Sequence, residues 1–253
     1  MKKYFKNAFY IITLVMPISV LLTGCVFVNT GNGMNRSSSV QAQGSRENYE
    51  IKVSAFNKIK IEGNCEIQYN YGNSDTVTLM VQPNIREYIV VETVNGELIF
   101  RTTSRISYGL SKSPVLTVYA PALNSVTIEG AGIFTANDKI TSDSLTLNIS
   151  GAGSGTAELD VNTFNVIISG AGNFNSSGKA NNSVITLSGA GNYNGLSLLT
   201  ADTTVNLTGA GSVKVYSTGV LRIDADGAGS VEYKGSPSLQ LNTSGLIGIK
   251  NLN

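Results

Sequence analysis

The tripeptide Gly-Ala-Gly recurs six times in the second half of this 253-residue chain, and no other feature constrains the fold as strongly. The intervals between successive copies are 21, 19, 19, 20 and 18 residues. A seventh, degenerate copy begins at Gly245. A repeat of about 20 residues is typical of solenoids, in which each repeat forms one coil that stacks on its neighbours. The first glycines of the six copies are Gly130, Gly151, Gly170, Gly189, Gly209 and Gly227.

Apolar and polar residues alternate on both sides of each Gly-Ala-Gly corner. Before Gly170, the apolar residues Phe164, Val166 and Ile168 occupy every second position, and Phe174 follows four residues after it. Alternation with a period of two indicates β-strands. The sequence therefore predicts an all-β fold, a parallel β-solenoid in which each coil of about 20 residues contains at least two short strands.

The solenoid is expected to be right-handed, because connections between parallel strands are right-handed in nearly all proteins. An antiparallel sandwich is the alternative fold, and its turns would recur about every 8–12 residues rather than every 20. Glycine suits the corners because it tolerates positive φ and because it lets the backbones of stacked coils approach closely. The alanine between the glycines is expected to place its methyl group in the corner of the core.

Residues 51–124 have no Gly-Ala-Gly copy but show the same alternation in shorter stretches. We interpret them as a less regular continuation, so that residues 51–253 form one β domain. The expected strands are centred on the pairs Ile59/Ile61, Ile67/Tyr69, Val77/Leu79, Ile89/Val91, Leu98/Phe100 and Leu116/Val118.

The first 25 residues have the pattern of an export signal. Lys2, Lys3 and Lys6 precede an apolar run at 11–22 that is shorter than the roughly 20 residues needed to span a bilayer. The run ends in Leu-Thr-Gly-Cys25, which resembles the bacterial lipobox, where cleavage leaves a lipid-modified cysteine. An ordinary secretory signal with an incidental cysteine is the alternative.

These residues predict a lipoprotein of the bacterial cell envelope that is bound to the membrane through its N-terminal lipid. Residues 1–24 would be the signal peptide. Residues 25–50 would comprise the lipidated Cys25 and a flexible tether, because this stretch is rich in Ser, Asn, Gly and Gln and has little periodicity.

Composition removes several classes of function. The chain has no histidine, which excludes mechanisms based on a Ser-His or Cys-His pair and metal sites built on histidine. Its two cysteines cannot form a Cys₄ zinc site, and Cys65, among apolar strand residues, is expected to be buried. A net charge of +1 provides no basic excess for nucleic acid. We therefore expect no metal, no cofactor and no nucleic-acid partner.

Residues one, three and five positions before each corner should point outward and form ladders that run up the solenoid. Most of them carry hydroxyl or amide groups. Such ladders occur as solvated faces or as side-chain stacks that support the coils, and they could also bind a repetitive polar ligand such as a glycan. The residues predicted for this ligand face are Ser150, Ser169, Ser188, Thr208, Asn148, Thr186 and Asn206.

The sequence leaves two other functions open as alternatives. Arg222, Asp224 and Asp226 lie outward on one predicted strand, and carboxylates two residues apart are about 6.6 Å apart, near the separation in inverting glycosidases. Alternating charges on an exposed strand more often serve solubility, so we expect no catalytic site. A structural envelope protein is the other alternative, assembling with protein partners or as a homodimer through the weakly capped end at residues 249–253.

The sequence resembles the head GIN domain family of auto-transporter adhesins. The resemblance rests on an apolar residue, a Ser or Thr and then Gly-Ala-Gly, as in Ile149–Gly153, Ile168–Gly172 and Leu187–Gly191, and it covers residues 51–249. It implies an exported, often lipid-anchored, right-handed β-solenoid and supplies no catalytic motif. Gly248 departs from the pattern by one position. Together these observations predict a binding or adhesion module, for glycan or another surface ligand, rather than an enzyme.

Overall fold

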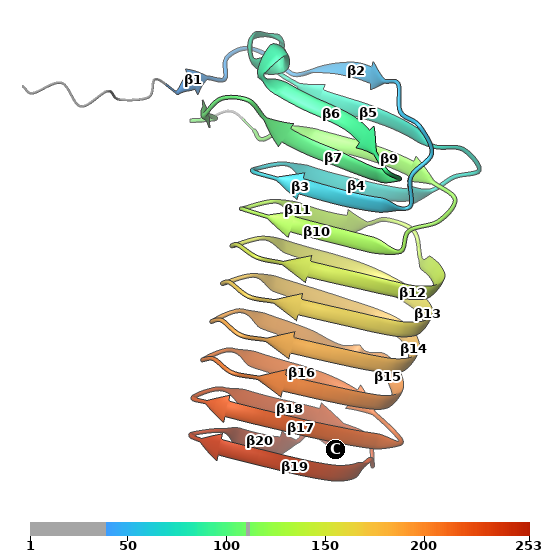
Figure 1. Ribbon diagram of the computed structural model, residues 1–253, viewed down its shortest axis with the longest axis vertical. Coiled ribbons are helices and arrows are strands. Elements are labelled where there is room, and N and C mark those ends of the chain that lie inside the picture. Colours follow the sequence, from blue (N-terminus) through green and yellow to red (C-terminus); the bar gives the residue numbers. More distant parts are fainter. Residues whose placement is uncertain (1–38, 110–111) are drawn as a thin grey trace, which may run out of the picture. The chain divides into compact units, whose positions relative to one another are not determined.

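The computed structural model describes residues 39–109 and 112–253, and these residues form a tall stack of β-coils (Figure 1). All described residues lie in one compact unit. The predicted signal peptide and Cys25 therefore lie outside the described residues. No helix among those residues is long and apolar enough to cross a membrane.

Seven coils follow one another from Ser125 to the end of the chain. Each coil has a front side, formed by the residues before a Gly-Ala-Gly corner, and a back side, formed by the residues after it. The strands are β10 (Ser125–Glu129), β11 (Ile133–Ala136), β12 (Ile140–Ile149), β13 (Ser154–Ile168), β14 (Asn173–Leu187), β15 (Asn192–Leu207), β16 (Ser212–Ser217), β17 (Val220–Gly227), β18 (Ser230–Lys234), β19 (Ser238–Gly245) and β20 (Gly248–Asn251).

Equivalent residues of successive coils pair in register. Ile149 pairs with Ile168, which pairs with Leu187, and all three are fully buried. Every pairing within these seven coils is parallel. In Figure 1 the near strands point to the left while the chain descends toward β20, which makes the coil right-handed. The predicted parallel β-solenoid is thus confirmed.

The first part of the chain also forms strands, but it stacks in a different order from its sequence. β3 (Lys58–Glu62) lies between β7 (Glu97–Thr102) and β10, and β4 (Glu66–Tyr71) lies between β9 (Val115–Ala120) and β11. The coil formed by β7 and β9 therefore stacks on the opposite side of β3 and β4 from the seven later coils. The segment between β9 and β10 crosses the β3–β4 coil, where the Asn124 N–H donates to the Asn57 carbonyl.

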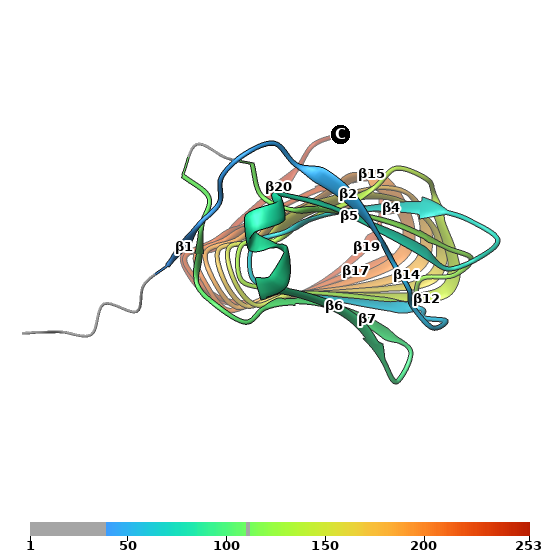
Figure 2. The ribbon, with the colours of Figure 1, turned by 90° about the horizontal axis from the view of Figure 1, so that it is seen from above.

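Antiparallel strands close this end of the stack, which we call the cap end. β5 (Thr76–Val81) pairs antiparallel with β9, β2 (Glu47–Ile51) with β5, and β6 (Ile89–Val94) with β7. The 3₁₀ helix η1 (Pro83–Tyr88) lies across the end of the stack and buries Ile85 (Figure 2). The sequence pattern located β5, β6, β7 and β9, but it located neither β2 nor the antiparallel pairing.

Part of the predicted tether belongs to the folded unit. β1 (Val40–Gln41) pairs with β8 (Ile106–Ser107), Ala42 is buried, and β2 contributes an edge strand. The boundary expected at residue 50 is therefore wrong for residues 40–50. Polar composition misled here, because edge strands with one solvent-facing side are rich in polar residues.

The corners are built by close stacking rather than by unusual backbone angles. A Cβ atom placed on Gly170 would overlap the carbonyl oxygen of Gly151 in the coil before it. The φ angles of Gly151 and Gly170 are not positive, so the expected need for positive φ does not apply to these central corners. Ala171 is exposed, which corrects the expectation that this methyl group enters the core.

Candidate binding face

The predicted ligand face lies on the front side of the solenoid, on four consecutive coils. Three columns of side chains point outward there, and none of these twelve positions carries a charge. Ser150, Ser169, Ser188 and Thr208 are exposed, and Asn148, Thr186 and Asn206 are half-buried. We call these twelve positions the uncharged face: Thr146, Asn148, Ser150, Asn165, Ile167, Ser169, Val184, Thr186, Ser188, Thr204, Asn206 and Thr208.

The column nearest the corner presents four hydroxyl groups at the regular spacing of stacked strands, about 4.8 Å. The backbone of this column is fixed by the coil, since the Ser169 N–H donates to Ile149 O at 2.9 Å and the Ser188 N–H to Ile168 O at 2.9 Å. Among the described residues, the hydroxyls of Ser150, Ser169 and Ser188 have no protein hydrogen-bond partner. These hydroxyls are therefore available to water or to a ligand.

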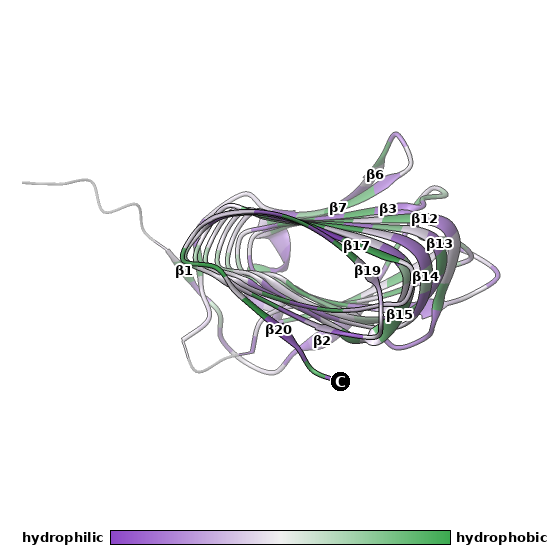
Figure 3. Cartoon of the chain, turned by 90° about the horizontal axis from the view of Figure 1, so that it is seen from below, coloured by the Kyte–Doolittle hydropathy of each residue, from purple (hydrophilic) through white to green (hydrophobic). Residues whose placement is uncertain are grey.

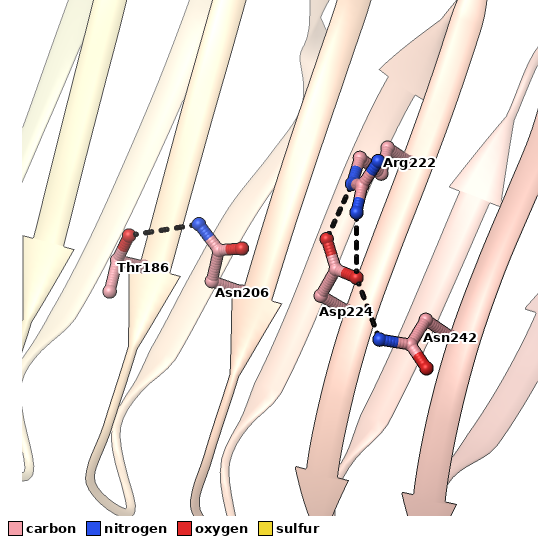
Figure 4. Close-up of polar contacts among 5 residues, drawn as sticks. All are labelled: Thr186, Asn206, Arg222, Asp224 and Asn242. Atoms are coloured by element: carbon pink, nitrogen blue, oxygen red, sulfur yellow. Dashed lines mark hydrogen bonds and ion pairs between the residues drawn. The ribbon is translucent and has the colours of Figure 1, made fainter.

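The middle column is only partly engaged in contacts within the protein. Asn206 donates to the Thr186 hydroxyl at 3.4 Å, a long bond between neighbouring coils (Figure 4). Ile167, in the same column, remains 40% exposed. The face thus combines free hydroxyls and amides with a small apolar area, a mixture suited to the polar and apolar edges of a sugar.

Ion pairs border the uncharged face on both sides. Toward the cap end, the Lys60 ammonium lies 2.8 Å from Glu62 and 3.2 Å from Glu129. On the other side, the Arg222 guanidinium donates two hydrogen bonds to the Asp224 carboxylate, of 2.6 and 3.2 Å (Figure 4). Asp226, which continues the hydroxyl column in the coil next to Thr208, is exposed and forms no ion pair with a described residue.

The Arg222–Asp224 pair also bears on the catalytic alternative. The hydrogen bonds from Arg222 and then from Asn242, at 3.1 Å, lower the pKa of Asp224 below its ordinary value. A carboxyl group held in its ionised form is a poor general acid, since that role needs a raised pKa. The geometry around Asp224 therefore resembles an ion pair on a sheet surface rather than an acid–base pair.

A second polar ladder, on the back side, was missed by the sequence analysis. Asn192 donates to Asn173 at 2.7 Å and Asn194 to Asn175 at 3.3 Å, each across one coil. The signal was present in the sequence, because Asn follows Gly-Ala-Gly directly in two successive repeats. These amides bond to one another, so this ladder supports the stack in a way that the hydroxyl column of the front side does not.

Cys65 is buried as predicted, and burial raises its pKa well above the ordinary value for a thiol. A buried neutral thiol is a weak nucleophile. Its Sγ–H points to the carbonyl of Glu66 at 3.5 Å. Cys65 thus behaves as a small apolar core residue.

A family model described as "Putative auto-transporter adhesin, head GIN domain" matches residues 55–237. The chain belongs to this family. The stacked corners account for its repeated Gly-Ala-Gly motif, because any side chain at the first glycine would strike the coil before it. No curated protein matches the chain.

Solved structures share the fold of this head GIN domain protein. A protein of Bacteroides fragilis described as a putative adhesin superposes with a TM-score of 0.79 at 24% identity, covering 85% of this chain and all of the other. A protein of Parabacteroides distasonis described as a putative lipid binding protein has a TM-score of 0.72 at 17% identity, with the same coverage. A putative adhesin of Parabacteroides merdae has a TM-score of 0.67 at 18% identity, covering 85% and 99%. At these identities the likeness establishes the fold alone.

Proposed function

We propose that this protein is an adhesion module of the bacterial cell envelope, and that its uncharged face binds a glycan. The observation that carries the proposal is the column of unpartnered hydroxyls that repeats over four coils without an intervening charge. Membership of the adhesin head family supports a role at the cell surface. The predicted lipid on Cys25 would hold the module at the membrane.

The shape of the face favours a polymer over a small molecule. Small ligands bind in concave sites that bury most of their surface, whereas this face is one side of a parallel sheet (Figure 1). A hydrogen bond on such an exposed surface contributes only about 0.5–1.5 kcal/mol. A chain of sugars that lies across several coils can make many such bonds at once. The free energies of these bonds combine because the sugars are covalently linked.

A structural role is the competing function, in which the front ladder only supports the coils. The back-side asparagines show what a supporting ladder looks like in this molecule, since each amide bonds to the next at 2.7–3.3 Å. The hydroxyls of Ser150, Ser169 and Ser188 on the front side lack such bonds, and the Thr186 hydroxyl has one long bond of 3.4 Å. This contrast between the two sides favours a ligand for the front side.

The test is a binding array of glycans and cell-wall fragments with the purified protein and a Ser169→Lys/Ser188→Lys variant. We expect saturable binding to one polymer that the variant loses, because two lysines would crowd and charge the hydroxyl column. Both serines are exposed, so the fold should survive, as circular dichroism would show.

A Thr156→Lys/Ser197→Lys variant is the matched control, because both residues are exposed and lie in the first parts of β13 and β15, away from the uncharged face. It adds the same charge and should bind as the unsubstituted protein does. If both variants lost binding equally, the added positive charge, rather than damage to the hydroxyl column, would explain the loss. If the folded protein bound no polymer at all, the structural role would replace the proposal.

A further inference from the structure

β19 and β20 form the end of the stack opposite the cap, which Figure 3 shows from below. The inward-facing side chains of β19 are uncovered there. All eight residues of β19 are exposed. Leu239 and Leu241 are 40% and 52% exposed, although their partners in the previous coil, Leu221 and Ile223, are completely buried. Nothing in the described residues replaces the coil that covers these positions elsewhere in the stack.

The corner of this last coil is more apolar than any other corner. Gly245 pairs with Gly227, and Gly248 pairs with Ser230, so the coil keeps the register of the stack. Leu246 then stands where the earlier corner has Ala228, and it is 83% exposed. Terminal repeats of solenoids normally carry polar residues that keep them soluble. Here the terminal corner carries a larger apolar residue than the corner before it, as expected for a surface that is covered in the assembled protein.

The two ends of the stack also differ in how they protect their strand edges. At the cap end, the edge strand β2 carries Glu47 and Glu50, and β6 carries Glu92. Charges of this kind oppose pairing with another strand. β19 has the sequence Ser-Leu-Gln-Leu-Asn-Thr-Ser-Gly, which contains no charge and no proline. Its backbone groups on the outer side can therefore pair with another chain.

We propose that this end binds the same end of a second copy of the protein, giving a two-fold symmetric dimer in which β19 pairs antiparallel with its counterpart. A head-to-tail arrangement is disfavoured, because η1 and the antiparallel strands close the cap end. A two-fold axis normal to the sheets brings together the same edges of both copies, as an isologous interface requires.

The sequence of the last coil fits one register of this pairing. With Leu241 on the axis, the two Leu241 side chains face each other and Leu239 faces Thr243, all on the core side of the strand. The back side of the coil, formed by β20, faces its counterpart across the same interface.

Few charges lie at this interface. β19 carries none, and Lys250 is the only charged residue of β20. Lys250 pairs in register with Glu232, whose carboxylate lies 2.8 Å from the Lys214 ammonium.

Disulfide trapping tests the register directly. In the oxidised full-length protein, a Leu241→Cys substitution should form a covalent dimer, because the two Cα atoms would lie within the roughly 7 Å that a disulfide can span. Leu239→Cys is the matched control, since the two residues 239 would be about 13 Å apart in this register. The unsubstituted chain gives the background from Cys25 and Cys65. Equal trapping at both positions, or none at Leu241→Cys, would overturn the proposed register.

Sedimentation analysis tests the dimer without added cysteines. The unsubstituted protein should sediment as a dimer and Leu241→Lys as a monomer, because two lysines cannot be buried facing each other. Gln240→Lys is the control, because its outward side chain stays in solvent and the dimer should persist. An unsubstituted protein that stays monomeric at its highest soluble concentration would refute the proposal, and it would leave the glycan proposal untouched.

Discussion

At the scale of the residue, the stacked glycine column sets how closely the coils can approach at the corner. The Ala171 N–H donates to Gly151 O at 3.0 Å, and the Ala190 N–H donates to Gly170 O at 3.1 Å. These bonds continue the sheet ladder through the turn, so the corner leaves few backbone groups unpaired. A side chain at the first glycine would occupy the space through which these bonds run.

A Gly170→Ala substitution should therefore destabilise the protein although alanine is a small residue. The added methyl group overlaps Gly151 O, a backbone atom that cannot move without shifting a whole coil. We expect the free energy of unfolding to fall by about 1–3 kcal/mol or more, the range of overpacked sites. Urea unfolding followed by circular dichroism measures this loss.

The matched substitution is Ala171→Ser, one residue further along the same corner. Ala171 is exposed, so this change should stay within about 0.5 kcal/mol of the unsubstituted protein. Similar losses at both positions would show that the corner tolerates no change at all, and close stacking at Gly170 would not be the cause.

At the scale of the element, alternation predicted which side of each strand faces the core, but it did not always predict which strand is its neighbour. The columns before and after the corners are buried as expected, from Phe164 to Tyr193. Alternation could not place β3, because β7 and β10 offer it the same inward pattern, with Leu98 and Phe100 on one side and Val126 and Ile128 on the other. Periodicity decides which side of a strand faces the core, and neighbours with equal patterns are then chosen by the connections.

For the candidate site, the sequence likewise predicted which side chains point outward but not the hydrogen bonds that they form. The outward position of Ser169 and Ser188 followed from counting residues back from the corner, and the structure exposes both. Whether an amide bonds to its neighbour depends on side-chain rotamers that the sequence does not encode simply, so the difference between Asn206 and Asn192 emerged only from the structure. Tyr193 lies in the column of Phe174, so alternation places it in the core, but alternation does not predict the hydrogen bond of its hydroxyl.

That hydrogen bond joins β14 to β15 inside the core and yields a prediction. The hydroxyls of Tyr193 and Ser176 lie 2.6 Å apart, and both residues are buried. Tyr193→Phe leaves the Ser176 hydroxyl without its partner, which should cost about 1–3 kcal/mol of the free energy of unfolding. Adding Ser176→Ala should recover part of this loss, because the double variant has no unpaired buried hydroxyl. A double variant as unstable as the sum of the single changes would show that the bond is not coupled.

At the scale of the whole molecule, the solenoid has two different ends and two different sides. The cap end is closed by η1 and by charged edge strands, while the end at β19 exposes Leu239 and Leu241. The front side presents free hydroxyls, while the back side bonds its amides internally. These asymmetries separate the proposed tasks, because a polymer on the front side and a second copy at the open end would occupy different surfaces.

Attachment to the membrane through Cys25 is a prediction from the sequence alone. If the Leu-Thr-Gly-Cys25 sequence is processed as a lipobox, the protein expressed in a bacterial host should incorporate labelled fatty acid and fractionate with membranes. Cys25→Ser should abolish the label and release the protein, because serine provides no thiol for the lipid. Cys65→Ser is the control, since Cys65 is buried in the β domain and should leave both labelling and fractionation unchanged. Labelling that persists in Cys25→Ser would contradict the lipoprotein prediction and leave an ordinary secretory signal as the explanation of the N-terminal sequence.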